Sequence, residues 1–431
     1  MLRLLLPILL LLSWFGYGQS IIVNDPAAPE STLSAEALVN QVLIGGDCVS
    51  VEFTYLQENP EGVANPALRS WGYFNANGTG FPFAEGIILS SGFAKEAEGP
   101  NNTSSQSGNG TDWEGDDDLK VLLDNQSGDN EPTNNATVFQ FSFTPIIANI
   151  SFDFIFASEE YENEFECDSQ FRDGFAFLLR GPGIPNSSGT AYGGINIAAV
   201  PGSINVPVST LSIHSNTFTC GTEIFGVNFF PEFYVSNWAG NNMNEIQFDG
   251  YTESLSAQAT LVPGETYELK MVIGDRGDSS FDSAVFFRAG SFDIGSVDLG
   301  VDLTVDNNTA RCEGETFTII PELSVPVGTT YEWQYEDPIG SGVFVPFVPA
   351  ETGPTLDVTT TGNYKIIVDF AGVCESEGTL FVEFAPPFTY NDSPAPLILC
   401  DDDNDGFMEF DLSMADDDLT GGDPDLVVTY H

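Results

Sequence analysis

The sequence predicts an all-β protein built mainly from antiparallel sheets. Aromatic and aliphatic side chains alternate with polar ones in three stretches, at 139–143, 152–156 and 267–273. Alternation with a period of two is typical of strands that bury one face. Helical patterns are confined to 34–43 and 116–123, and turns rich in Gly, Asn and Pro separate the strands. Many short strands joined in this way favour a large antiparallel β-sandwich.

The first 18 residues form a predicted secretory signal peptide. Arg3 precedes an apolar run at 4–12, and the small residues Gly16 and Gly18 precede the polar Gln19. The apolar run is shorter than the roughly 20 residues that a membrane-spanning helix needs. We therefore expect cleavage near Gly18, an exported chain at the bacterial outer surface, and no transmembrane segment in the mature protein.

The charge is strongly one-sided, with 64 Asp and Glu against 11 Lys and Arg and a formal net charge of -53. Binding to phosphates needs clustered cations, so the composition excludes nucleic acid as a partner. The hydrophobic content of 42% and the 35 Phe argue against disorder, because that much apolar surface drives folding. An acidic surface suits salty surroundings and attracts divalent cations.

Changes in pattern divide the mature chain into three segments. Residues 19–295 are predicted to form the large sandwich, with a polar loop at 98–115. Residues 298–386 carry Cys312, Trp333 and Cys374 in the order of a smaller immunoglobulin-like β-sandwich. Tyr364 lies ten residues before the second cysteine rather than two, so this segment resembles bacterial Ig-like and PKD-like modules. Residues 387–431 begin a third, acidic module too short to bury a core, and we expect further domains of a longer polypeptide.

The six cysteines are expected to form disulfides, because the chain is exported and contains no CxxC pair. The predicted bridges each lie inside one predicted domain: Cys167–Cys220 and Cys312–Cys374. Cys400 is expected to pair beyond the end of this chain. Cys48 is left over, either buried and free or paired with Cys167 or Cys220 instead.

Two groups of acidic residues are candidate calcium ligands. The carboxylates of Asp401, Asp403 and Asp405 alternate before Gly406 with the spacing of a calcium loop, but the twelfth position is Leu412 rather than Glu. An acidic linker without an ion is the alternative there. The second group follows or precedes predicted strands and is expected at one rim of the sandwich: Glu159, Glu160, Asp173, Asp275, Asp278 and Asp282.

Three interpretations of this second group stay open. The carboxylates cap turns through backbone N–H groups, or hold a structural calcium ion that also orients a glycan, or include an acid pair for glycoside hydrolysis. Clustered carboxylates without matching cations repel one another unless a cation, protonation or backbone donors compensate.

Motifs spread over residues 72–286 carry a family resemblance. They are Gly72-Tyr73-Phe74, the segments 86–92, 115–119, 154–161, 173–177 and 196–202, and the long Gly-Asp-rich segment 274–286. Together they resemble the choice-of-anchor L domain, a family of exported bacterial proteins common among Bacteroidetes. The resemblance implies export and a C-terminal sorting or anchoring signal, often that of the type IX secretion system, but no catalytic residues. Residues 401–412 also resemble a module of long flavobacterial surface proteins.

No convincing catalytic set accompanies these motifs. His214 lacks a neighbouring Gly-x-Ser-x-Gly, and neither a Walker loop nor a dinucleotide fingerprint occurs. The sequence therefore predicts a non-enzymatic secreted or cell-surface binding or adhesion module with an extracellular glycan or protein ligand. The alternative is an exported polysaccharide-processing enzyme such as a glycoside hydrolase, or its carbohydrate-binding accessory. Trp71, Trp113 and Trp238 are the candidates for stacking on sugar rings.

Overall fold

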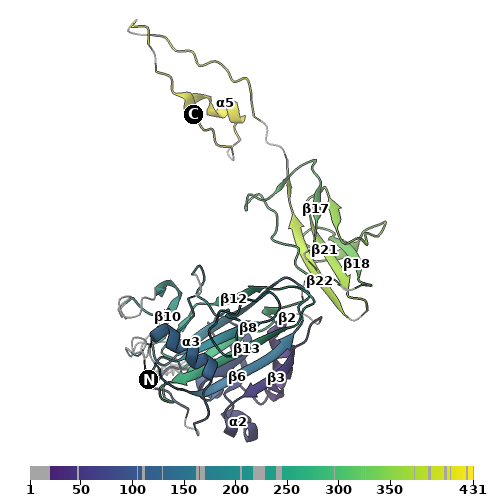
Figure 1. Cartoon of the computed structure of the whole chain (residues 1–431). Coiled ribbons are helices and arrows are strands. Elements are labelled where there is room, and N and C mark those ends of the chain that lie inside the picture. Colours follow the sequence, from purple (N-terminus) through teal and green to yellow (C-terminus); the bar gives the residue numbers. More distant parts are fainter. Residues whose placement is uncertain are drawn as a thin grey trace, which may run out of the picture. The chain divides into compact units, whose positions relative to one another are not determined.

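The fold is taken from a computed structural model of the chain (Figure 1). The structure describes residues 20–45, 48–103, 105–108, 112–128, 130–161, 165, 170–203, 206–216, 229–238, 245–295, 297–321, 323, 325, 327–372, 374–386, 390–401, 405–407, 409–423 and 426–430. The predicted signal peptide lies outside them. The chain divides into two compact units. The first unit comprises Met1–Asp298, Pro321–Tyr331 and Ile367–Gly378, and the second comprises Leu299–Ile320, Glu332–Ile366 and Thr379–His431.

The larger sheet of the first unit has ten strands, nearly all antiparallel. Its main path runs β1 (Ile22–Val23), β4 (Trp71–Asn75), β5 (Glu85–Ser90), β14 (Ser283–Arg288), β7 (Asn149–Ser158), β11 (Gly250–Thr252) and β10 (Tyr234–Ser236). Off this path, β12 (Leu255–Thr260) pairs with β7, and β15 (Phe292–Asp293) pairs with β7 and, in parallel, with β2 (Ile44–Gly45).

The second sheet of this unit has five strands. Their order is β3 (Glu52–Gln57), β6 (Thr133–Phe143), β13 (Tyr267–Arg276), β8 (Gly174–Arg180) and β9 (Ile195–Asn196). β13 pairs antiparallel with β6 on one side and β8 on the other, so it forms the centre of the sheet.

Phenylalanine side chains fill the space between the two sheets. Phe154 of β7 lies 5.0 Å from Phe177 and 5.5 Å from Phe175 of β8, measured between ring centroids in edge-to-face contacts. Phe139 and Phe141 of β6 join the same buried cluster. The all-β sandwich class is therefore confirmed, and the alternating aromatic residues form its core as predicted.

The outer faces of both sheets are also covered, which the alternation alone did not predict. Ile155 and Ala157 of β7 point away from the central core, yet both are buried in a second cluster with residues of the 74–97 region. Helix α3 (Asp117–Ser127) covers the outer face of the five-stranded sheet, as Figure 1 shows, and buries Leu119 and Leu123 against it. Strands with both faces buried lose the polar alternation, and the second half of β7 does so.

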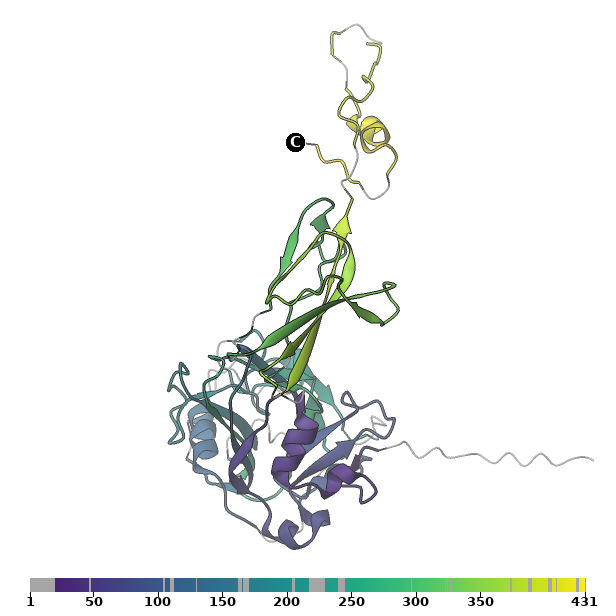
Figure 2. The ribbon, with the colours of Figure 1, turned by 90° about the vertical axis from the view of Figure 1, so that its right-hand side faces the viewer.

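The remaining helices are short. The predicted helix at 34–43 forms as α1 (Ala35–Leu38) continued by the π-helical turn η2 (Val39–Leu43), visible in purple beside the strands in Figure 2. The others are η1 (Pro29–Thr32), α2 (Pro60–Ala64), η3 (Pro66–Leu68), η4 (Ala94–Ala97), η6 (Pro231–Phe233), η7 (Leu412–Ala415) and α5 (Asp416–Thr420). No helix among the described residues has the length and apolar character needed to cross a membrane.

The second unit carries most of a four-stranded sheet and two strand pairs. The sheet runs β19 (Phe344–Pro346), β18 (Thr330–Glu336), β21 (Gly362–Asp369) and β22 (Glu375–Val382). The pairs are β17 (Phe317–Ile319) with β20 (Leu356–Val358), and β16 (Arg311–Cys312) with β23 (Phe384–Ala385). Trp333 is fully buried and donates from Nε1 to the Gly353 carbonyl at 3.0 Å. That the segment is immunoglobulin-like stays a prediction.

The predicted Cys312–Cys374 bridge is wrong, because Cys374 bonds with Cys48. Their Cα atoms lie 5.3 Å apart, within the usual range for disulfides. Cys374 lies just before β22, whereas Cys312 pairs with Ala385, just beyond the other end of that strand. A strand of 8 residues spans roughly 26 Å, so one disulfide cannot join the two ends. Cys167 and Cys220 lie outside the described residues.

Candidate functional site

Five acidic side chains gather at one edge of the sandwich. They form the acidic edge cluster: Glu159, Glu160, Asp173, Asp275 and Asp282. β7 and β14 pair through Ser158 and Ser283, and β8 and β13 pair through Gly174 and Gly274, so the four strands reach this edge in register. The Ser283 hydroxyl donates to Asp173 Oδ2 at 2.9 Å and thereby links the two sheets there.

The acidic edge cluster is closed to solvent. Glu159, Asp173 and Asp275 are fully buried, and Glu160 and Asp282 are 2% and 3% exposed. Such burial costs free energy unless the polar atoms find hydrogen bonds. Other segments of the chain supply many of these hydrogen bonds.

Backbone N–H groups are the main donors to the cluster. Asp173 N donates to Glu160 Oε2 at 2.6 Å, and Arg276 N donates to Asp173 Oδ1 at 3.0 Å. Gly108 N, from the polar loop, donates to Asp282 Oδ2 at 2.6 Å. Backbone donors therefore compensate for part of the burial, but they lie 13, 103 and 174 positions away from the acids they bind rather than in the same turn.

Burial also changes the acidity of the cluster. It raises the pKa of Glu159 to about 9, with the charges of Asp249 and Asp282 acting in the same direction. Burial and then the charge of Glu96 raise the pKa of Asp282 to about 8. For the other three members, burial raises the pKa well above its usual value: Glu160, Asp173 and Asp275. Each of these shifts favours the protonated form of the carboxyl group.

The calcium site expected at this cluster stays a prediction. Asp275 Oδ1 and Asp282 Oδ1 make no hydrogen bond within the part of the chain that the structure describes. A calcium ion in a protein is held by about six to eight oxygen atoms. Across the described ranges, no three His, Cys, Asp or Glu side chains are arranged so that they could hold a metal ion. Neighbouring cations are instead Arg172 and Arg276, both buried.

The other expected calcium ligands are not members of the cluster. Asp278 is exposed and caps its own turn, accepting Ser280 N at 3.0 Å. Asp401 and Asp405 accept backbone N–H groups of their own turn at 2.9 and 2.8 Å. Asp403 lies outside the described residues. The calcium loop at 401–406 stays a prediction.

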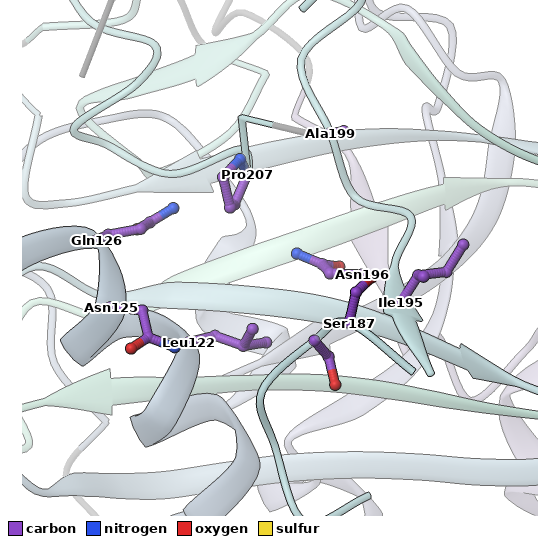
Figure 3. Close-up of a pocket in the computed structure, with 9 residues that line it drawn as sticks. Leu122, Asn125, Gln126, Ser187, Ile195, Asn196, Ala199 and Pro207 are labelled. Carbon is purple, nitrogen blue, oxygen red and sulfur yellow. The ribbon is translucent and has the colours of Figure 1, made fainter. Parts of the chain in front are cut away.

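A pocket of about 310 Å³ lies beside α3 on the five-stranded sheet (Figure 3). Helix α3, the loop after β8, β9 and the segment that follows it line this pocket with Leu122, Asn125, Gln126, Ser187, Ser188, Ile195, Asn196, Ala199 and Pro207. None of these nine side chains carries a charge. In a chain of net charge -53, the pocket is a neutral surface of amides, hydroxyls and aliphatic groups.

Backbone hydrogen bonds hold the walls of this pocket in place. Ser187 N and Ser188 N both donate to the Gly194 carbonyl, at 2.9 and 2.8 Å. Asn196 Oδ1 accepts Phe177 N at 3.0 Å, which fixes the side chain on β9. Figure 3 shows the amide ends of Gln126 and Asn196 extending toward each other across the space. The chain's own hydrogen bonds therefore fix the positions of these lining residues.

A buried lysine fixes α3, and with it one wall of the pocket. Lys270 of β13 is 5% exposed, and its Nζ lies 2.6 Å from Oδ2 of both Asp116 and Asp118. Asp116 also caps α3 by accepting Leu119 N at 2.9 Å. Burial alone would raise the pKa of Asp118, but hydrogen bonds from Lys270 and from Tyr192 N outweigh it and hold that pKa below its usual value.

Two of the three tryptophans considered for sugar stacking are engaged elsewhere, and the histidine considered for nucleophilic catalysis is buried. Trp71 is 3% exposed and donates from Nε1 to Glu58 at 2.6 Å, and Trp113 donates to the Ala136 carbonyl at 2.9 Å. His214 is 1% exposed, and burial lowers its pKa. Neither they nor Trp238 lines the pocket. The residues that do line it were missed because Asn, Gln and Ser scattered over 122–207 show no spacing signal.

The fold defines an all-β sandwich module, and comparison with known families places it further. The profile of the choice-of-anchor L domain matches residues 23–293, more than half of the chain. The chain therefore belongs to the choice-of-anchor L domain family. The profile of the Flavobacterium inter-domain disulphide bond domain matches residues 396–431. Both descriptions indicate an exported or cell-surface protein.

The similarities to solved structures are weak. The crystal structure of DIP-gamma IG1+IG2 is 16% identical, with a TM-score of 0.16, over 29% of this chain and 69% of that one. A β-1,2-glucanase from Parabacteroides distasonis is 10% identical, with a TM-score of 0.18, over 81% of this chain and 39% of the glucanase. At such TM-scores neither similarity bears on fold or activity. A search among curated proteins found no match.

Proposed function

We propose that the chain is a non-enzymatic binding module of the cell surface and that the pocket beside α3 takes a neutral, polyhydroxylated ligand, such as a saccharide. The uncharged lining of that pocket carries the proposal. Amides of Asn125 and Gln126 and the hydroxyl of Ser187 offer both donors and acceptors to sugar hydroxyl groups. Leu122 and Ile195 offer apolar contact to the C–H face of a sugar ring.

Electrostatics favours a neutral ligand over a charged one. The net charge of -53 repels anions from the whole surface. A cationic ligand would find no carboxylate in the lining to pair with, and carboxylates elsewhere on the surface would compete for it. A neutral ligand is subject to neither effect, so shape and hydrogen bonds decide its binding.

The burial of the acidic edge cluster supports binding over hydrolysis. Glycoside hydrolysis needs two carboxyl groups that flank the scissile bond, about 5 to 10 Å apart. Glu160 and Asp173 are 2% and 0% exposed, and neither lines the pocket. A polysaccharide chain would reach these buried acids only if the residues that cover them moved, so a polysaccharide-processing enzyme has less support than a binding module.

A glycan array probed with the mature chain tests the proposal. We expect binding to neutral glycans that is unchanged by EDTA and is lost in the double variant Asn125→Ala, Gln126→Ala. The matched control is Asn307→Ala, an exposed asparagine outside the pocket, which should bind as the parent does. Undiminished binding by the double variant would contradict the assignment, and so would polysaccharide turnover that disappears in Glu160→Gln.

A further inference from the structure

Two cysteines of the second unit are free and exposed, Cys312 and Cys400. Export brings a chain into oxidising surroundings, in which accessible thiols form disulfides. The other two cysteines that the structure describes are already joined to each other, Cys48 to Cys374. Each exposed thiol is therefore left to pair with the other, with a cysteine outside the described residues, or with another molecule.

The segment that leads to Cys400, residues 386–399, begins beside Cys312 and acts as a tether. In the parallel pair of β16 and β23, Cys312 lies opposite Ala385, and Glu313 N donates to the Ala385 carbonyl at 2.8 Å. Residues 386–399 then lead to Cys400, with neither helix nor strand in their described part. Such a tether reaches up to roughly 50 Å when extended, and a disulfide needs Cα atoms within about 7 Å. Cys400 is therefore within easy reach of Cys312.

The described residues within 396–431 form no core that would hold them in one place. Of their described members, Thr420 alone is buried. Large apolar side chains are exposed instead: Ile398, Leu399, Phe407, Phe410, Leu412, Met414 and Val427. Short exported segments that cannot bury a core are commonly held by disulfides.

Charge favours the approach of this segment to Cys312. Arg311 directly precedes Cys312, and its Nε is buried without a hydrogen-bond acceptor among the described residues. Cys400 is followed directly by the acidic run 401–405, and residues 396–431 contain no Lys or Arg. A carboxylate of this run that pairs with Arg311 would satisfy the buried donor and bring the two sulfur atoms together.

We propose that Cys312 and Cys400 form a disulfide that fastens residues 396–431 to the β16–β23 pair of the second unit. The family description of residues 396–431 names an inter-domain disulphide without a partner, and the register and tether supply one. The oxidant is a small or protein disulfide. The Cys312 thiolate attacks it and releases one thiolate, and the Cys400 thiolate then attacks the Cys312 sulfur and releases the second. Both protons of the original thiols leave to solvent or to the released thiolates, so the oxidant gains the two electrons.

Non-reducing peptide mapping of the mature chain after treatment with oxidised glutathione tests this disulfide. We expect a linked pair of peptides that contain Cys312 and Cys400. Limited proteolysis within 386–399 should leave the C-terminal fragment attached until a reductant is added. Cys312→Ser and Cys400→Ser should each leave the other thiol open to alkylation with unchanged circular dichroism, because both side chains are exposed.

Arg311→Gln is the test of the electrostatic step, and it should slow formation of the disulfide without changing which peptides are linked. Three results would overturn the proposal: a link from Cys400 to Cys167 or Cys220, a covalent dimer formed through Cys400, or alkylation of both thiols after oxidation.

Discussion

Removing the Cys48–Cys374 disulfide should cost the chain a large share of its stability. The two cysteines are 326 positions apart, so the bond closes a very long loop in the unfolded chain. The chain-entropy relation for a loop of this length gives a stabilisation of about 6 kcal/mol. Folded domains are typically stable by about 5 to 15 kcal/mol, so the loss should be evident in equilibrium unfolding.

Urea unfolding of Cys48→Ala, Cys374→Ala and the double variant measures this loss. Each single substitution removes the same bond, so the double variant should cost no more than either single one. Ser50→Ala changes an exposed side chain near Cys48 that takes no part in the bond, and should stay within about 0.5 kcal/mol of the parent. Reduction of the disulfide in the parent chain should lower its unfolding free energy to nearly that of the variants.

Two outcomes would refute the reasoning from loop closure. A loss below about 2 kcal/mol in both single variants would mean that the bond restricts the unfolded chain far less than its loop length requires. A double variant that costs the sum of the two single variants would mean that each cysteine acts through its own packing.

Three further perturbations follow from the buried groups. The unfolding free energy should fall as pH rises from about 4.5 to about 9, because folded Glu159 keeps its proton up to a pKa of about 9 and loses it near 4.5 when unfolded. The unfolding free energy, measured with urea across this range, should fall by about 1.4 kcal/mol per pH unit for each such group, so Glu159→Gln should reduce the slope by about that amount and Asp278→Asn should leave it unchanged. Lys270→Met should cost about 3 to 5 kcal/mol by urea unfolding, since it leaves two partly buried carboxylates without their cation; an unchanged midpoint would contradict this. Phe177→Ala should cost about 3 to 5 kcal/mol, because its ring packs between four other Phe rings, and a loss below 1 kcal/mol would show a core able to collapse around the gap.

The strands and the main helix were predictable because their signals are local. Phe139, Phe141 and Phe143 alternate within β6, and neighbouring residues in a strand necessarily face opposite sides. The helix predicted at 116–123 forms at Asp117–Ser127, with Asp116 as its N-cap. It runs longer than predicted and ends at Gly128, whose φ of 76° gives the left-handed conformation common at helix ends.

The sites were harder to predict because they depend on segments far apart in the chain. Strand ends indicated that Glu160 and Asp173 would meet, but no pattern indicated that the polar loop reaches Asp282 through Gly108 and helps to close the cluster. The pairing of Cys374 likewise depends on which end of β22 it occupies and on its distance from Cys312, and neither follows from cysteine order. Periodicity describes one element at a time, whereas these contacts arise between elements.

The Cys48–Cys374 bond also determines how a mechanical load would pass through a surface protein of this kind. A pull applied between residues before Cys48 and residues after Cys374 is carried across the two sulfur atoms and bypasses the polypeptide between them. The strands from β3 to β15 lie in that bypassed stretch, so they would keep their pairing with one another while the flanking segments, which include β1 and β2, stretch. Shear from flow or from an attached cell would then leave the pocket beside α3 intact until the disulfide itself is reduced or broken.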